Sequence, residues 1–149
     1  RSQFAQVWAH MAAKWYGIES NAFSGGVEVT AFNIHAITAL RKAGFDIIVN
    51  EGTNPTCYVK CNETNTPLPA FSKLFDHEIN PKENFATVMT CSDADENCPF
   101  IPGAEARIPL LYDDPKEFDN TAEQDAKYLE RSEQIGSELL YVYRAIKEL

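Results

Sequence analysis

The chain has 149 residues, of which 44% are apolar and 23% are charged, and these values predict one soluble globular domain over residues 1–149. The net charge of −9 argues against a nucleic-acid partner, because no cluster of Lys and Arg can neutralise a phosphate backbone. No apolar run approaches about 18 residues, so we expect neither a membrane-spanning helix nor a membrane partner. Four cysteines are too few for a disulfide scaffold, and we therefore expect a reducing compartment, the cytoplasm.

The first third of the chain alternates between helical and extended patterns. A first helix is predicted because Phe4, Val7, Met11 and Trp15 lie at helical spacing and Gly17 can end it. The elements expected next are a short strand running into a glycine loop over 21–29, a helix over 31–45 with Asn33 as N-cap and Gly44 just past its end, a strand over 45–49 and a loop over 50–56.

The rest of the chain predicts further strands and a long final helix. Residues 57–75 predict a β-hairpin, and the apolar runs at 85–91 and 107–113 are typical of buried parallel strands. Asn120 and Glu123 predict a capping box at the start of an amphipathic helix that runs to the C-terminus. This alternation predicts an α/β fold with a parallel sheet and helices on both faces.

The two cysteines Cys91 and Cys98 flank an acidic segment, so a metal site is the first possibility. A zinc site usually has two closely spaced pairs of ligands, and no second pair lies at a matching distance here. Asp93, Asp95 and Asn97 match the first ligands of a calcium loop, but the glycine and the final glutamate of that loop are missing. We therefore expect no metal at this segment.

Without a metal, three interpretations of Cys91 and Cys98 remain. A permanent disulfide is disfavoured in a reducing compartment. Two cysteines packed at the end of a core strand are the simplest alternative, since unpaired Cys is among the most buried residue types. A redox pair is the third, because a rearrangement of the six intervening residues would bring the two sulfurs to bonding distance.

Arg1 and Ser2 open the first helix pattern and are candidates for binding an oxyanion. A guanidinium group can hold two oxygens of a tetrahedral anion, and the N–H groups of a first helical turn favour negative charge. An exposed arginine at a frayed helix end is the simpler alternative. Further along, Asp114 precedes Pro115 and is expected to be extended. Its carboxyl group is either a general acid above a cleft or part of an ordinary turn.

These signals occur together, and in the same order, in a known family. The segments that carry the resemblance are RSQFAQ (1–6), 23–47, TVMTCSDADENCP (87–99) and LLYDDP (110–115). They resemble the low-molecular-weight protein tyrosine phosphatase superfamily, and within it the thioredoxin-coupled arsenate reductases. The resemblance implies a three-layer fold with a parallel four-stranded sheet, with residues 50–82 as a hairpin-like insertion.

The resemblance also assigns the anion-binding and catalytic residues. The superfamily carries a C-x5-R-S/T loop after its first strand, and Arg1 and Ser2 match the last two residues of that motif. We therefore expect the first strand and the nucleophilic cysteine to precede Arg1, so that this chain by itself is inactive. By resemblance, Arg1 holds the equatorial oxygens of arsenate or phosphate, Ser2 stabilises the nucleophilic thiolate, and Asp114 protonates the leaving oxygen.

Cys91 and Cys98 distinguish the two subfamilies. In the arsenate reductases, Cys91 would attack the arsenic adduct and release arsenite, and Cys98 would then take over a disulfide that thioredoxin reduces. One alternative is a phosphatase that hydrolyses phosphotyrosine, with the two cysteines as a redox guard, and another is a non-catalytic anion-binding module. Some relatives bind potassium through a first-helix Glu. Gln6 stands there and Ser24 matches a second position, which is an incomplete set, so no cofactor is expected.

Overall fold

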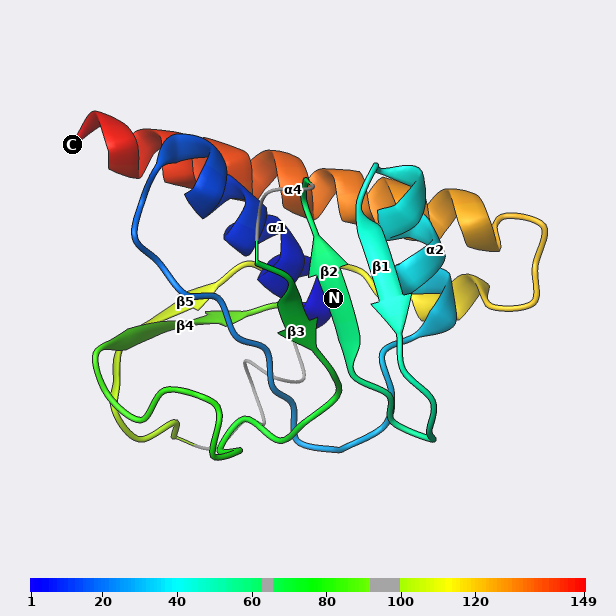
Figure 1. Ribbon diagram of the computed structural model, residues 1–149, viewed down its shortest axis with the longest axis horizontal. Coiled ribbons are helices and arrows are strands. Elements are labelled where there is room, and N and C mark those ends of the chain that lie inside the picture. The colour runs from blue at the N-terminus through cyan, green and yellow to red at the C-terminus, as the bar shows by residue number, and fades with distance from the viewer. Residues whose placement is uncertain (63–65, 92–99) are drawn as a thin grey trace.

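The computed structural model describes residues 1–62, 66–91 and 100–149 (Figure 1), and the statements below concern this part of the chain. Cys98 and the acidic residues that precede it lie outside the described residues. The elements in chain order are α1 (Ser2–Tyr16), α2 (Ile34–Lys42), β1 (Asp46–Val49), β2 (Cys57–Lys60), β3 (Leu68–Ala70), β4 (Phe85–Met89), β5 (Ala104–Pro109), the 3-10 helix η1 (Pro115–Phe118) and α4 (Gln124–Glu148).

The two predicted N-terminal helices are confirmed, and their ends show why the sequence predicts them. Gly17 ends α1 with a φ of 64°, a left-handed conformation that glycine adopts without steric cost. Asn33 caps α2, because its side-chain oxygen accepts a hydrogen bond from the backbone N–H of His35 at 2.8 Å. Both signals act within a few residues, so tertiary contacts are not needed to read them.

The long helix α4 is the element against which the other helices pack. Its buried residues recur every three or four positions (Tyr128, Arg131, Ser132, Ile135, Gly136 and Leu139). Figure 1 shows α4 running the length of the molecule with α1 and α2 against it. Phe4, Val7, Leu40 and Ile135 are almost fully buried in the resulting core. No helix in the described part of the chain is long and apolar enough to cross a membrane.

The start of α4 corrects one expectation. Asn120 does not form a capping box with Glu123, because α4 begins at Gln124 and Glu123 is its N-cap, without a capping side-chain hydrogen bond. Asn120 instead has a φ of 63° and its backbone N–H is bound by the side chain of Gln124 at 2.9 Å. Asn120 and Glu123 are residue types typical of a capping box, but the chain makes a further turn between Asn120 and the first residue of α4.

Gly136 allows α1 and α4 to approach closely, and this gives a first prediction. A Cβ atom at Gly136 would lie 2.7 Å from two atoms of the Trp8 ring. That ring is fixed by a hydrogen bond to Ser132 at 3.0 Å and by an edge contact with Phe45. We expect Gly136→Ala to lower the free energy of unfolding by roughly 1–2 kcal/mol, because overpacking outweighs the gain in helix propensity of about 1 kcal/mol.

Urea denaturation monitored by circular dichroism measures this change. Ser137→Ala on the exposed side of the same helix turn is the matched control, and its effect should stay within about 0.5 kcal/mol. A Gly136→Ala protein as stable as the wild type would show that the overpacking costs no more than the gain in helix propensity of about 1 kcal/mol.

The sheet arrangement departs from the predicted parallel four-stranded sheet, which is not confirmed in the described residues. Two sheets are present: β1, β2 and β3 form an antiparallel meander, and β4 pairs with β5 in parallel. The loop after β1 closes with a hydrogen bond from the N–H of Asn50 to the carbonyl of Thr56, which returns the chain antiparallel. The predicted hairpin over 57–75 is therefore present as β2 and β3, and β1 joins it instead of a parallel sheet.

The strand expected over 21–29 is wrong. This segment makes a single bridge, between Gly26 and Leu74, and is otherwise irregular. Gly25 explains the difference, since a Cβ atom there would lie 2.5 Å from the Cα of Phe75. The segment uses its glycines for close approach to residues 73–75, and glycine is a poor strand former.

Candidate functional site

Arg1 stands at the N-cap of α1, and its guanidinium group reaches across to the segment that follows β5. One nitrogen, Nη2, forms an ion pair with Oδ2 of Asp114 at 2.8 Å, and the other, Nη1, donates to the carbonyl oxygen of Tyr112 at 2.9 Å. Its side chain is only 21% exposed, so the ion pair is partly shielded from water. The structure thus brings together Arg1 and Asp114, which are 113 positions apart in the sequence.

Asp114 has the extended conformation expected before proline, with φ −82° and ψ 115°. Its Oδ1 accepts from the backbone N–H of Lys116 at 3.1 Å and so caps the 3-10 helix η1, while Oδ2 binds Arg1. Both oxygens are therefore oriented, one by local sequence and one by a distant residue. The simpler alternative of an ordinary turn accounts for the first contact but not for the second.

Cys91 follows β4 and is half-buried. Its thiol lies within electrostatic range of the backbone nitrogen of Arg1. The placement of Cys98, and hence the geometry of the predicted pair, lies outside the described residues.

A cavity of about 190 Å³ adjoins the ion pair. Its polar lining includes Arg1, Asp114, Lys116, Asn33 and Tyr128. The hydroxyl group of Tyr128 accepts from Asn33 at 3.1 Å and donates to Asp119 at 2.8 Å, which fixes it in place. The cavity is thus a small, polar hollow with one guanidinium at its wall, and its size suits a small oxyanion.

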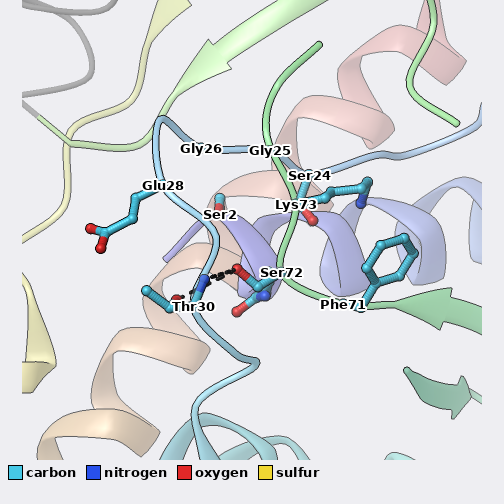
Figure 2. Close-up of a pocket in the computed structure, with 10 residues that line it drawn as sticks. Ser2, Ser24, Gly25, Gly26, Glu28, Thr30, Phe71, Ser72 and Lys73 are labelled. Carbon is cyan, nitrogen blue, oxygen red and sulfur yellow. Dashed lines mark hydrogen bonds between the residues drawn. The ribbon is translucent and has the colours of Figure 1, made fainter. Parts of the chain in front are cut away.

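Ser2 lines a neighbouring cavity of about 130 Å³ and not the cavity of Arg1 and Asp114. Figure 2 shows it opposite the loop of Gly25 and Gly26, with Ser72 bound to the backbone N–H of Thr30. The first-turn position of Ser2 agrees with the predicted oxyanion site, but the structure separates its side chain from Asp114.

The residues that would have to hold a potassium ion do not fit one. Gln6 offers an amide in place of a carboxylate, and its Oε1 already accepts a hydrogen bond from the hydroxyl of Ser24 at 2.7 Å. The Gln6 amide nitrogen donates to the carbonyl of Ala22 at 3.2 Å. The pair satisfies itself without a cation. In the described part of the chain, no three His, Cys, Asp or Glu side chains are grouped as metal ligands.

The remaining cysteines, Cys57 and Cys61, are reduced thiols near the core. Cys57 is fully buried on β2 and Cys61 is half-buried just after it. Burial raises the pKa of both thiols, which lowers the fraction of thiolate at neutral pH. Neither thiol is therefore suited to act as a nucleophile.

Tyr112 is not recognisable from the sequence as a site residue, because it contacts Arg1 through its main-chain carbonyl. Any residue type can supply that carbonyl, so no side-chain motif marks it. The hydroxyl of Tyr112 also binds Glu138 of α4 at 2.6 Å, a contact between residues 26 positions apart. The only signal in the sequence is a tyrosine within an otherwise apolar segment, two residues before Asp114.

Comparison with known proteins identifies relatives of this chain. No family model matches the chain. It is 29% identical over 140 residues to the arsenate reductase of Bacillus licheniformis, covering 93% of this chain and 84% of that protein. It is 32% identical over 115 residues to arsenate reductase 2 of Staphylococcus epidermidis, and 32% identical over 117 residues to the arsenate reductase of Staphylococcus aureus, covering 77% of this chain and 70% of the relative in both cases. The chain therefore belongs to the arsenate reductase family, and through it to the low-molecular-weight protein tyrosine phosphatase superfamily.

Proposed function

We propose that this protein is an arsenate reductase that reduces arsenate to arsenite through a relay of cysteine thiols and takes its electrons from thioredoxin. The observation that carries the proposal is the ion pair between Arg1 and Asp114, beside a polar cavity in a chain whose relatives are named arsenate reductases. An anion-binding group and an acid within hydrogen-bond distance are what an oxyanion reaction with a leaving oxygen needs.

Arg1 is the proposed anion-binding group. Its guanidinium fork binds two oxygen acceptors in this structure, the Asp114 carboxylate and the Tyr112 carbonyl. Oxygens of a tetrahedral arsenate can replace the Asp114 carboxylate on the guanidinium group, while Nη1 keeps its hydrogen bond to the Tyr112 carbonyl. Asp114 would then be released from Arg1 to protonate the oxygen that leaves as water, while Ser2 stabilises the nucleophilic thiolate at the start of α1.

The proposed relay transfers two electrons from cysteine sulfurs to arsenic. The nucleophilic thiol, which the family motif places before Arg1, displaces one oxygen of arsenate as water and forms a covalent sulfur–arsenic(V) adduct. The thiolate of Cys91 then attacks this adduct, so that two sulfurs lose two electrons, a disulfide forms and arsenic leaves as arsenite. The Cys98 thiolate attacks the Cys91 sulfur of that disulfide and releases the nucleophilic cysteine as a thiolate. The dithiol of thioredoxin finally reduces the Cys91–Cys98 disulfide and is itself oxidised to a disulfide.

Disulfide mapping on the natural protein tests the relay. The fully reduced protein is incubated with one equivalent of arsenate without thioredoxin, alkylated, digested and examined by mass spectrometry. We expect an intramolecular disulfide between Cys91 and Cys98, with Cys57 and Cys61 still alkylated as reduced thiols after unfolding. The expected loss is two titratable thiols per arsenite released.

Inorganic phosphate is the matched control ligand, because it fits the same anion site but cannot accept electrons. It should leave every thiol reduced. If arsenate also leaves every thiol reduced while p-nitrophenyl phosphate is hydrolysed, the protein is a phosphatase and not a reductase. If neither reaction occurs and the anion still binds, it is a binding module.

A further inference from the structure

Tyr112 connects three parts of the site, because all three of its polar groups are engaged with different elements. Its backbone N–H donates to the carbonyl of Thr90 after β4 at 3.2 Å. Its backbone carbonyl accepts from Nη1 of Arg1 at 2.9 Å. Its hydroxyl donates to Oε2 of Glu138 on α4 at 2.6 Å. The residue is 6% exposed, so these bonds are largely shielded from competing water.

The partners of Tyr112 are the immediate neighbours of the proposed reacting groups. Thr90 precedes Cys91, and Asp114 follows Tyr112 by two residues. A rotation of Tyr112 would therefore displace the carbonyl that holds Arg1, the carboxylate that pairs with it and the strand end that carries Cys91. The relative positions of these groups depend on one residue that makes no proton or electron transfer.

Helix α4 supports Tyr112 and its neighbour over two turns. Arg131 approaches the Asp113 carboxylate at 3.6 Å, two turns before Glu138 binds the Tyr112 hydroxyl. Gln134 lies between the two on the same face, accepts from Arg131 and donates to the other carboxylate oxygen of Glu138 at 3.4 Å. Glu138 is thus itself oriented, and the tyrosine is held by a prepared acceptor.

The hydroxyl of Tyr112 is engaged by Glu138, and its electrostatic surroundings favour the protonated form. Burial raises the pKa of this hydroxyl above its ordinary value, and the hydrogen bond and charge of Glu138 raise it further. The hydroxyl is therefore protonated at neutral pH and donates the hydrogen bond to Glu138 there. Its contribution is therefore geometric.

We propose that Tyr112, held by Glu138, is the positioning residue that sets Arg1, Asp114 and Cys91 relative to one another. This inference rests on the proposed function for the roles of those three groups, but the anion-binding geometry it describes is testable without turnover. A misplacement of about 1 Å in a catalytic group is enough to reduce a rate by roughly 10²-fold.

Tyr112→Phe in the natural protein removes one hydroxyl and leaves the ring. Three quantities are measured: the Kd of inorganic phosphate by titration calorimetry, kcat and KM for arsenate with thioredoxin, and the melting temperature. We expect the Kd of phosphate to rise about tenfold and kcat to fall about tenfold, the scale of one lost hydrogen bond to a charged group. Tyr143→Phe is the matched control, because that hydroxyl also joins α4 to a loop, through Ser20 at 3.1 Å, away from the site.

Variants of Glu138 separate positioning from general stability. Glu138→Leu should reproduce the losses of phosphate affinity and kcat seen in Tyr112→Phe, and the double variant should be no worse than either, since the Tyr112–Glu138 hydrogen bond is absent in all three. Glu138→Gln keeps an oxygen acceptor and should restore phosphate affinity to within about threefold of wild type.

If Tyr112→Phe lowers the melting temperature but leaves phosphate affinity and kcat unchanged, as expected for Tyr143→Phe, the positioning role is overturned. A wild type that binds phosphate but turns over no arsenate would overturn the proposed function alone.

Discussion

Replacing Cys91 with serine in the natural protein is expected to abolish thioredoxin-coupled arsenate turnover while leaving the fold intact. Serine has nearly the same shape as cysteine, but its hydroxyl is not ionised at neutral pH and cannot form a disulfide bond. The reaction should stop after the first adduct forms, so arsenite is not released. We expect turnover to fall by roughly 10⁴-fold or more, the scale seen when a nucleophile is removed from an enzyme. NADPH consumption coupled through thioredoxin reductase measures the loss.

Two controls make this result specific to the relay. Cys61→Ser removes another half-buried thiol, one whose pKa is raised by burial and which lies after β2, outside both cavities. It should turn over arsenate as the wild type does. Hydrolysis of p-nitrophenyl phosphate needs no second thiol and should survive in Cys91→Ser. Undiminished arsenate reduction by Cys91→Ser would mean that Cys91 takes no part in electron transfer.

Helices were predictable in this chain because their signals are local. The spacing of Phe4, Val7 and Met11, the αL glycine at 17 and the Asn33 cap all act within one or two turns. Strand pairing is different, since the partner of a strand is set by contacts that the strand sequence does not contain. The chain over 45–49 was recognised as a strand, but its antiparallel pairing with β2 depends on the loop that returns after Asn50.

The candidate site was predictable only where a motif fixes side-chain types. Arg1 and Asp114 come from two such motifs, and the ion pair between them is found in the structure. The carbonyl of Tyr112 and the carboxylate of Glu138 carry no motif, because one is a main-chain group and the other lies on a helix whose polar face has many acids. Interactions that hold a site together are thus harder to read from a sequence than the groups that react.

Arg1 is expected to be intolerant of even the most similar replacement. Arg1→Lys keeps the positive charge but replaces a planar fork with a single ammonium group, which cannot face the Tyr112 carbonyl and the Asp114 carboxylate with two parallel donors. The same geometry is needed for two equatorial oxygens in the transition state. We expect kcat/KM for arsenate in the natural protein to fall by about 10²- to 10³-fold, mostly in kcat.

Whether the loss of activity in Arg1→Lys appears in kcat or in KM shows at which stage the guanidinium group of Arg1 acts. A lysine still attracts the oxyanion as a point charge, so KM should change by less than about tenfold, whereas the lost transition-state bond appears in kcat. Arg144→Lys is the matched control, because that arginine pairs with Glu148 at 3.0 Å on the exposed side of α4 and should tolerate the change. An Arg1→Lys enzyme with more than half of wild-type kcat would show that charge alone suffices. The two donors seen in the structure would then serve only to hold Asp114 in the free protein.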